Sequence, residues 1–157
     1  MRKTIAKSEG DTRALALALA ADLHPGMLVA LSGELGTGKT ALVRGMCEHF
    51  GCLEQVTSPT FTIINQYEGS VSIAHCDLYR LDTVDALFET GIADILQGDA
   101  IVLIEWAERA LALLPFPRIE ILCDYGEEES ERVFAVAEVA TVEASMLLRH
   151  QSMEAVK

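Results

Sequence analysis

The chain has 157 residues, of which half are apolar and 23% are charged, so it can bury one hydrophobic core and does not have the composition of a disordered chain. Its formal charge of −12 comes from 24 acidic and 12 basic residues, which disfavours direct binding of DNA or RNA. Four cysteines show neither CxxC spacing nor a Cys/His metal pattern, so we expect structural thiols in a reducing cytoplasm.

The first predicted elements are a strand and a helix. Residues 3–7 favour a short edge strand, and Asp11 or Thr12 is the expected N-cap of a helix that runs to about Leu23. The apolar run at residues 14–21 is too short to span a bilayer, so no membrane association is expected. The buried stripe of the helix is expected to consist of Leu15, Leu19 and Leu23.

A glycine-rich segment connects the next strand and helix. Residues 27–32 form a short continuous apolar run, which is typical of a strand buried on both faces. Apolar residues then recur with helical spacing from Lys39 to about Phe50, and Gly51 stands where a C′ glycine ends a helix. A strand, a glycine-rich loop and a helix therefore follow one another directly.

The rest of the chain predicts further strands and two helices. An exposed loop is expected at residues 57–60, and Asp82 or Thr83 is the expected cap of the first of these helices. The strands are expected at residues 61–67, 71–76, 100–104, 119–123 and 133–136, and the helices at residues 83–88 and 141–149.

The glycine-rich segment from Gly33 to Thr40 satisfies the P-loop pattern G-x-x-x-x-G-K-[ST] in full. Its glycines let the backbone wrap an anion, and the following helix adds its positive N-terminal end. Lys39 would reach the β- and γ-phosphates of a nucleotide, and Thr40 would offer a hydroxyl to Mg²⁺. ATP is the expected nucleotide, because no Asn-Lys-x-Asp segment that would read guanine follows the apolar strands. The predicted nucleotide-binding residues are Gly33, Glu34, Leu35, Gly36, Thr37, Gly38, Lys39, Thr40, Ala41 and Trp106.

Strands that alternate with helices around such a loop predict the fold class. We expect an α/β protein with the three-layer α/β/α arrangement of P-loop NTPases and a mostly parallel sheet. The hairpin signals predict an antiparallel portion at one side of that sheet. No repeat, low-complexity tract or linker divides the sequence, so a single domain over residues 1–157 is expected.

Two acidic residues end apolar strands and are candidates for the metal site. Asp77 follows the run at residues 71–76, and Glu105 follows the run at residues 101–104. A carboxylate at either position would hold Mg²⁺ directly or through its waters, or would orient an attacking water. The alternative is that each residue simply begins a solvated loop, and the sequence does not decide which carboxylate would touch the metal.

Several other polar or aromatic residues have two interpretations. The hydroxyl-bearing residues Thr57, Ser58 and Thr60 lie where a switch loop would sense the γ-phosphate, although an ordinary surface turn has the same composition. Trp106 either packs in the core or lies beside the nucleotide or a partner. Arg80 would contact phosphate or pair with an acid. The four histidines show no ligand spacing and are expected to be structural or solvated.

Taken together, these segments resemble the bacterial TsaE family, formerly called the YjeE family. Order, spacing and total length agree from about Gly10 to Val136. The P-loop is shared by many families, whereas the segments around Asp77 and Glu105 are far more specific. The matching segments are residues 33–40, residues 42–45 (Leu-Val-Arg-Gly), residues 58–61 (Ser-Pro-Thr-Phe), residues 75–81 (His-Cys-Asp-Leu-Tyr-Arg-Leu) and residues 104–109 (Ile-Glu-Trp-Ala-Glu-Arg).

The resemblance implies a small ATPase of the machinery that makes threonylcarbamoyl-adenosine next to the tRNA anticodon. It implies that Lys39 and Thr40 bind phosphate and Mg²⁺, that Thr60 belongs to the switch loop, and that Asp77 and Glu105 are required for ATP hydrolysis. It also implies that the chain acts on the TsaD and TsaB subunits and meets tRNA only through them. Small departures from the family pattern, Ala107 and residues 91–94, affect local loop shape.

Other functions remain open as alternatives. A small-molecule P-loop kinase is the main one, but the chain has only 12 Lys and Arg residues and no clustered basic lid. A regulatory GTPase is disfavoured by the missing guanine-reading segment. A nucleotide-sensing binding module without significant turnover differs from a slow ATPase only in rate, and a phosphate-release assay would separate the two.

Overall fold

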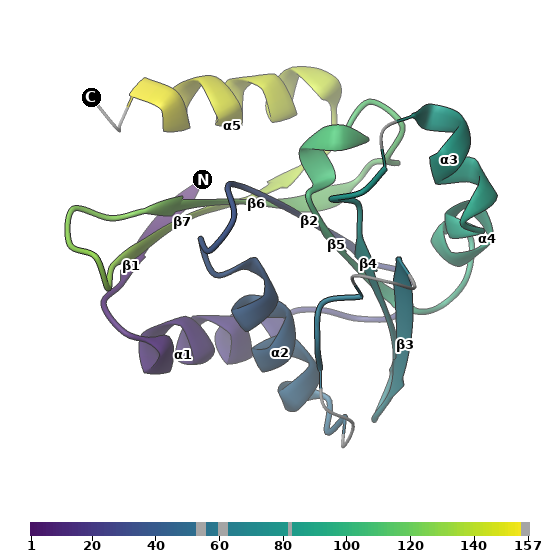
Figure 1. Cartoon of the computed structure of the whole chain (residues 1–157), viewed down its shortest axis with the longest axis horizontal. Helices are drawn as coiled ribbons and strands as arrows, with labels where there is room; N and C mark the ends of the chain where they lie inside the picture. Colours follow the sequence, from purple (N-terminus) through teal and green to yellow (C-terminus); the bar gives the residue numbers. More distant parts are fainter. Residues whose placement is uncertain (53–55, 60–62, 82, 155–157) are drawn as a thin grey trace.

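The computed structural model describes residues 1–52, 56–59, 63–81 and 83–154, and a seven-stranded sheet forms its centre (Figure 1). The strands are β1 (Arg2–Ala6), β2 (Leu28–Ser32), β3 (Ile64–Glu68), β4 (Ser72–Asp77), β5 (Ile101–Glu105), β6 (Arg118–Tyr125) and β7 (Arg132–Val139). The helices are α1 (Glu9–Ala20), α2 (Lys39–His49), α3 (Val84–Glu89), α4 (Ile92–Leu96), the 3₁₀ turn η1 (Ala107–Arg109) and α5 (Val142–Glu154).

The sheet is mixed, with the strand order β1-β7-β6-β2-β5-β4-β3. The four central strands β6, β2, β5 and β4 are parallel, whereas β7 and β1 at one side and β3 at the other are antiparallel to their neighbours. The antiparallel portion thus lies at both sides rather than at one. Short hairpins join β3 to β4 and β6 to β7, and a short connection can only join antiparallel neighbours.

Helices cover both faces of the sheet, as the three-layer expectation requires. In Figure 1, α1 and α2 lie on one face and α5 lies on the other. The central strand β2 is buried throughout, and its side chains alternate between two cores. Val29 and Leu31 pack with α1 and α2, whereas Leu28 and Ala30 pack with the residues of α3, α4 and η1. The predicted strand buried on both faces is confirmed.

The N-terminal helix begins earlier than predicted. Its N-cap is Ser8, whose hydroxyl accepts a hydrogen bond from the backbone N–H of Asp11 at 3.2 Å. The Asp11 carboxylate accepts a hydrogen bond from the N–H of Lys7, the residue before the cap, at 2.9 Å, so it also fixes the chain that enters this helix. Leu19 is only partly buried, because a stripe of every fourth residue drifts by about 40° per step around a helix of 100° per residue.

The other predicted elements are found with small changes of boundary. Thr83 caps α3, since its hydroxyl accepts a hydrogen bond from Ala86 N–H at 3.2 Å, and Asp82 lies outside the described residues. The loop predicted to be exposed at residues 57–60 is partly buried, because Pro59 is buried and Ser58 is half-buried while Thr57 is exposed; Thr60 lies outside the described residues. The short elements α4 and η1 were not predicted. The four cysteines are free, and three of them are buried. In the part of the chain that the structure describes, no helix is long and apolar enough to cross a membrane.

Candidate functional site

The glycine-rich loop (residues 33–40) connects β2 to α2 and closes around its own lysine. Lys39 Nζ donates hydrogen bonds to the carbonyl oxygens of Gly33 at 2.7 Å and Glu34 at 2.8 Å. Gly33 has a φ of +144°, and a Cβ atom at this position would lie 2.1 Å from the carbonyl oxygen of Cys123 in β6. Only glycine fits here, since β2 and β6 run side by side up to Ser32. Burial raises the pKa of the Cys123 thiol, so this neighbour of the loop stays neutral.

Two residues of the β6–β7 hairpin hold the outer side of the loop. Arg132 Nε donates a hydrogen bond to the carbonyl oxygen of Gly36 at 2.9 Å, and the Tyr125 hydroxyl donates one to the carbonyl oxygen of Leu35. No pattern in the sequence marks either residue. They lie far from the loop in sequence, and no local pattern marks a side chain that bonds to a distant backbone.

Glu105 lies at the centre of the polar cluster below the loop. Its Oε2 accepts a hydrogen bond from the Thr40 hydroxyl at 2.9 Å, and its Oε1 lies 2.8 Å from Nε2 of His75. Glu105 is only 2% exposed and His75 is fully buried. The alternative in which Glu105 begins a solvated loop is therefore wrong. His75, expected only to be structural or solvated, contacts a predicted site residue.

Asp77 ends β4 directly beside Glu105, since the two residues are partners in the parallel β4–β5 pair. Asp77 is 8% exposed, so it does not begin a solvated loop either. Its carboxylate accepts hydrogen bonds from the Ser58 hydroxyl and from the backbone N–H of Tyr79, the latter at 2.9 Å. Ser58 thereby links the loop at residues 56–59 to the carboxylate. Thr60, predicted as the residue of that loop that belongs to the site, lies outside the described residues.

Trp106 follows Glu105 and forms an aromatic wall beside Lys39. Its backbone is left-handed, with a φ of 57°, and the indole lies under Lys39 Nζ at 4.0 Å from the ring centroid. The ring of Tyr79 packs against it with centroids 4.8 Å apart. Trp106 is partly buried, so it is neither a full core residue nor a free surface one. A lysine ammonium over an indole face is held there by a cation–π attraction.

These side chains surround one pocket of about 410 Å³. Of the predicted nucleotide-binding residues, Gly33, Glu34 and Thr37 are not among those that line it, and the Thr37 hydroxyl instead donates to Glu34 O at 2.8 Å. Arg80 is exposed at its rim. The lining residues are Leu35, Gly36, Gly38, Lys39, Thr40, Ala41, Ser58, Asp77, Tyr79, Arg80, Glu105 and Trp106.

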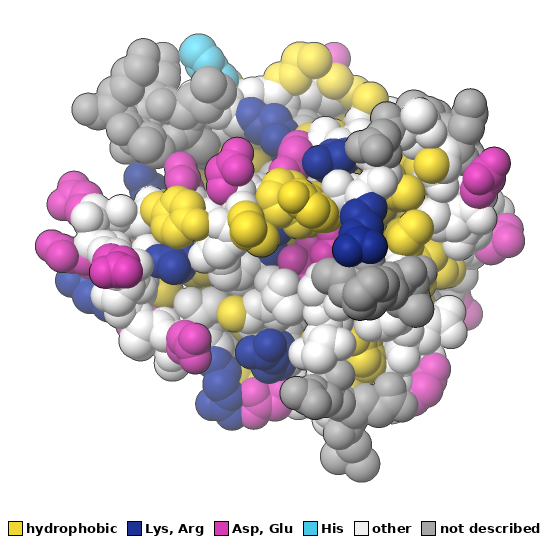
Figure 2. All heavy atoms as spheres, viewed as in Figure 1, with side chains coloured by type: hydrophobic (Ala, Val, Ile, Leu, Met, Phe, Trp, Pro, Cys, Tyr) yellow, Lys and Arg dark blue, Asp and Glu magenta, His cyan; other side chains and the backbone are white. Residues whose placement is uncertain are grey.

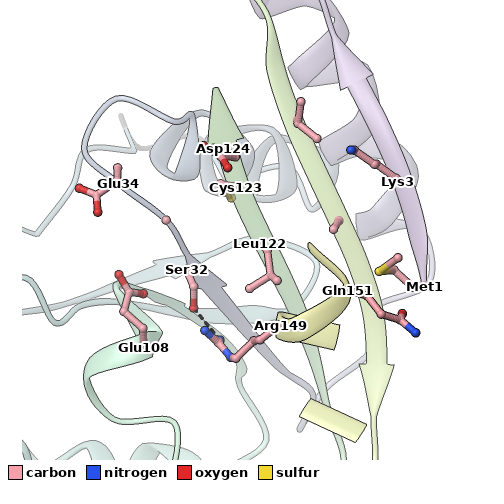
Figure 3. A pocket seen from close by; sticks show the side chains of 13 residues that line it. Met1, Lys3, Ser32, Glu34, Glu108, Leu122, Cys123, Asp124, Arg149 and Gln151 are labelled. Atoms are coloured by element: carbon pink, nitrogen blue, oxygen red, sulfur yellow. Dashed lines mark hydrogen bonds between the residues drawn. The ribbon is translucent and has the colours of Figure 1, made fainter. Parts of the chain in front are cut away.

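A larger cavity of about 590 Å³ lies on the other side of the loop, between α5 and strands β6 and β7 (Figure 3). Arg149 of α5 points to the base of the loop there and donates a hydrogen bond to the Ser32 hydroxyl at 3.1 Å. The cavity includes Gly33 and Glu34 but neither Lys39 nor the paired acids, and its walls are mostly apolar. We therefore assign the candidate site to the smaller pocket, which contains the groups able to bind phosphate and a cation.

A buried ionic cluster ties α5 to the sheet next to this larger cavity. Glu120 of β6 is fully buried and accepts hydrogen bonds from Arg118 at 2.8 and 2.9 Å. The Ser145 hydroxyl and Arg149 of α5 donate to the same carboxylate at 2.6 and 3.3 Å. A buried charge with this many partners is stable where it lies but costly to disturb. The helix is thus attached to the strand that flanks the glycine-rich loop.

The visible face of the molecule carries charges of both signs around an apolar centre. Figure 2 shows hydrophobic side chains gathered across its middle with Lys and Arg side chains among them, and Asp and Glu side chains at several of its edges. Exposed apolar residues near the glycine-rich loop include Leu35, which is 73% exposed, and Tyr125, which contacts it.

The chain is similar to proteins of one named family. The family described as "Threonylcarbamoyl adenosine biosynthesis protein TsaE" matches residues 6–134. A protein of Rickettsia bellii named tRNA threonylcarbamoyladenosine biosynthesis protein TsaE is 41% identical over 121 residues, which cover 76% of this chain and 83% of that protein. A protein of the same name from Bacillus subtilis is 35% identical over 146 residues, or 91% of each chain. The crystal structure of Bacillus subtilis YdiB matches with a TM-score of 0.74 and 28% sequence identity, covering 98% of this chain and 95% of that one.

Proposed function

The chain belongs to the TsaE family and has its P-loop NTPase fold, and from this premise we propose that it binds ATP and hydrolyses it slowly as an accessory subunit of the bacterial tRNA N6-threonylcarbamoyladenosine machinery. The observation that carries the proposal is the contact between the Thr40 hydroxyl and Glu105 at 2.9 Å, at the mouth of the glycine-rich loop. A hydroxyl and a carboxylate in this position are the parts that P-loop NTPases use for nucleotide and Mg²⁺.

Phosphate binding follows from the loop and its lysine. The backbone of residues 33–40 leads into the N-terminus of α2, where N–H groups and the helix dipole favour an anion. Lys39 is held by two carbonyl oxygens and the Trp106 ring. A phosphate is a stronger partner for an ammonium group than a neutral carbonyl, so we propose that bound ATP draws Lys39 out of these contacts.

The donor set of the pocket fits Mg²⁺. Thr40, Asp77 and Glu105 offer only oxygen atoms, which are the ligands that this ion prefers. Among the described residues no group of three or more His, Cys, Asp or Glu side chains forms a protein-only metal cage. Mg²⁺ in nucleotide sites is held by one or two protein oxygens together with phosphates and water, so such a cage is not needed. When bound, the ion would supply charge neutralisation at the β- and γ-phosphates.

The two carboxylates would divide the work of hydrolysis. Glu105 accepts a hydrogen bond from the Thr40 hydroxyl, which leaves the lone pairs of that hydroxyl oxygen available to a cation. We assign to Asp77, which Ser58 and the backbone of Tyr79 hold in place, the orientation of the attacking water. The water oxygen would form a bond to the γ-phosphorus as the bond from that phosphorus to the bridging oxygen breaks, and the proton lost by the water would pass to Asp77 and on to solvent, while Lys39 stabilises the charge on the leaving ADP.

We propose that ATP binding and hydrolysis by this chain act on partner subunits rather than on a substrate of its own. A formal charge of −12 disfavours direct contact with tRNA, so the TsaD and TsaB subunits would hold the RNA. The position of Ser58 links the loop at residues 56–59 to Asp77, and we propose that ATP orders this loop for docking. We also propose a cytoplasmic location, because ATP and the tRNA to be modified are found there.

The test is nucleotide-dependent assembly with purified TsaD and TsaB. Binding would be measured by analytical ultracentrifugation with ATP, with ADP and without nucleotide. Lys39→Ala should abolish the ATP-dependent part of binding, because the phosphates lose their point charge. Lys3→Ala removes the same charge from an exposed position outside the pocket and should assemble normally. Unchanged ATP-dependent assembly of Lys39→Ala would contradict the proposal.

Phosphate release measured in parallel distinguishes a slow ATPase from a nucleotide-sensing module without turnover. A slow ATPase releases phosphate alone or with the partners, and Glu105→Ala should suppress this release. A binding module releases none in either condition, and that result would leave assembly as the whole function.

A further inference from the structure

His75 stands apart from the groups assigned to ATP and Mg²⁺, yet it is bound to one of them. It lies on β4 two residues before Asp77, so both side chains project from the same face of the sheet. Its Nε2 lies 2.8 Å from Glu105 Oε1, with the imidazole fully buried. Glu105 therefore has one carboxylate oxygen on His75 and the other on Thr40.

This pair of contacts fixes the orientation of the Glu105 carboxylate. A glutamate side chain with a single partner can rotate about its terminal bonds. Hydrogen bonds to both oxygens remove that freedom, and burial strengthens each bond because water does not compete. The Thr40 hydroxyl belongs to the proposed nucleotide site, so its geometry changes when ligands bind. The contact of Glu105 with His75 should persist when ligands bind, because His75 is buried and does not line the pocket.

The second ring nitrogen, Nδ1, shows that packing alone does not explain why a histidine occupies this position. Among the described residues, His75 Nδ1 is buried and has no hydrogen-bond partner. A buried nitrogen without a partner is unfavourable, and an apolar side chain would fill the same space without this cost. The Tyr67 ring lies beside it, with centroids 6.3 Å apart, and its hydroxyl donates a hydrogen bond to Thr57 O at 3.3 Å. His75 thus lies between Glu105 and the strand that holds the loop at residues 56–59.

We propose that His75 is a positioning residue for the hydrolytic site: it holds Glu105 Oε1 so that Oε2 remains directed at the Thr40 hydroxyl. The inference rests on the proposed ATPase function of the same site. Outer partners of a metal-binding carboxylate orient it and tune its affinity, so loss of His75 should act on the Mg²⁺-dependent step rather than on nucleotide binding as such.

The test compares His75→Phe with His75→Gln. Phenylalanine fills the space without an N–H donor, whereas the glutamine amide can place a donor close to the position of Nε2. We expect His75→Phe to lower kcat about 10- to 100-fold while ATP affinity without Mg²⁺ changes less than about twofold. His75→Gln should recover most of the lost kcat. Cys76→Ala is the matched control, because Cys76 is buried on the same strand but packs in the opposite core. It should lower thermal stability without lowering kcat.

Two results would overturn the inference: an unchanged kcat in His75→Phe, or an equal loss in both histidine variants, which would indicate packing alone. A second readout does not require turnover: the affinity for a non-hydrolysable ATP analogue is measured with and without Mg²⁺, and the increase caused by Mg²⁺ is called the Mg²⁺-dependent gain. A wild-type chain that releases no phosphate contradicts the proposed ATPase. In that case a reduced Mg²⁺-dependent gain in His75→Phe, restored in His75→Gln, still supports the positioning role, and an unchanged gain refutes it.

Discussion

The sharpest test of the loop geometry is the replacement Gly33→Ala. The added Cβ would lie 2.1 Å from the carbonyl oxygen of Cys123 and 3.0 Å from its carbonyl carbon. Both atoms belong to the backbone of a central strand, so neither can move aside as a side chain would. The φ of +144° is an additional strain for any residue with a Cβ.

The expected cost combines these two effects. A residue held in a sparsely populated backbone conformation costs about 1–3 kcal/mol. Overpacking in a well-packed interior costs about 1–3 kcal/mol. We therefore expect Gly33→Ala to lower the free energy of unfolding by roughly 2–6 kcal/mol, a large fraction of the roughly 5–15 kcal/mol that holds a typical domain together.

Urea unfolding followed by far-UV circular dichroism, without nucleotide, measures this loss. Gly51→Ala is the control, because Gly51 also has a positive φ, of +73°, but a Cβ there would meet no atom within 4 Å. Gly51→Ala should lower the free energy of unfolding by only about 1–2 kcal/mol, which is the strain of a left-handed backbone conformation. The difference between the variants reports the contact with Cys123 together with the excess backbone strain at a φ of +144°. If Gly33→Ala loses no more stability than Gly51→Ala, the close approach of β2 and β6 does not constrain this position.

Three further predictions concern the ionic cluster, the thiols and the tryptophan. Glu120→Ala should lower the free energy of unfolding by about 3–5 kcal/mol, because Arg118 would remain buried without its partner; a loss below about 1 kcal/mol in urea unfolding would contradict this. Burial raises the pKa of Cys76 to about 12 from 9.0, so the unfolded chain releases this proton first. The contribution of the neutral Cys76 thiol to the free energy of unfolding is present below pH 9 and should fall as pH rises toward 12. In Cys76→Ala the free energy of unfolding, measured by urea unfolding at a series of pH values, should therefore fall less steeply over this range. ATP should change the fluorescence of Trp106, the only tryptophan, as Lys39 leaves its ring, and the change should be absent in Lys39→Ala.

Much of the fold was predictable because the signals are local. The apolar run of β2, the glycine-rich loop and the helical spacing of α2 occupy one continuous segment, so no distant contact is needed to recognise them. The helix α4, with five residues, is too short to show a period. The sequence favours Asp11 or Thr12 as the cap of α1, whereas the structure has Ser8 there, because several adjacent residues have side chains that can cap a helix.

The candidate site was predictable in its components but not in its contacts. Asp77 and Glu105 each follow an apolar strand, and parallel strands bring their carboxyl ends to one edge of a sheet, so their proximity could be expected. His75 could not be singled out, since a histidine inside an apolar strand is usually a core residue. Its contact with Glu105 depends on which strands are neighbours and which faces their side chains share.

The sequence by itself therefore determined the chemical groups: a glycine-rich loop with the P-loop pattern, a hydroxyl, two carboxylates and one tryptophan, each identified from its immediate neighbours in the chain. Only the tertiary structure decided how they pair. Because β5 lies next to β2 and β4 lies one strand further away, it is Glu105 rather than Asp77 that meets Thr40. Strand order is set by the packing of the whole sheet, and that information is spread over residues far apart in the chain.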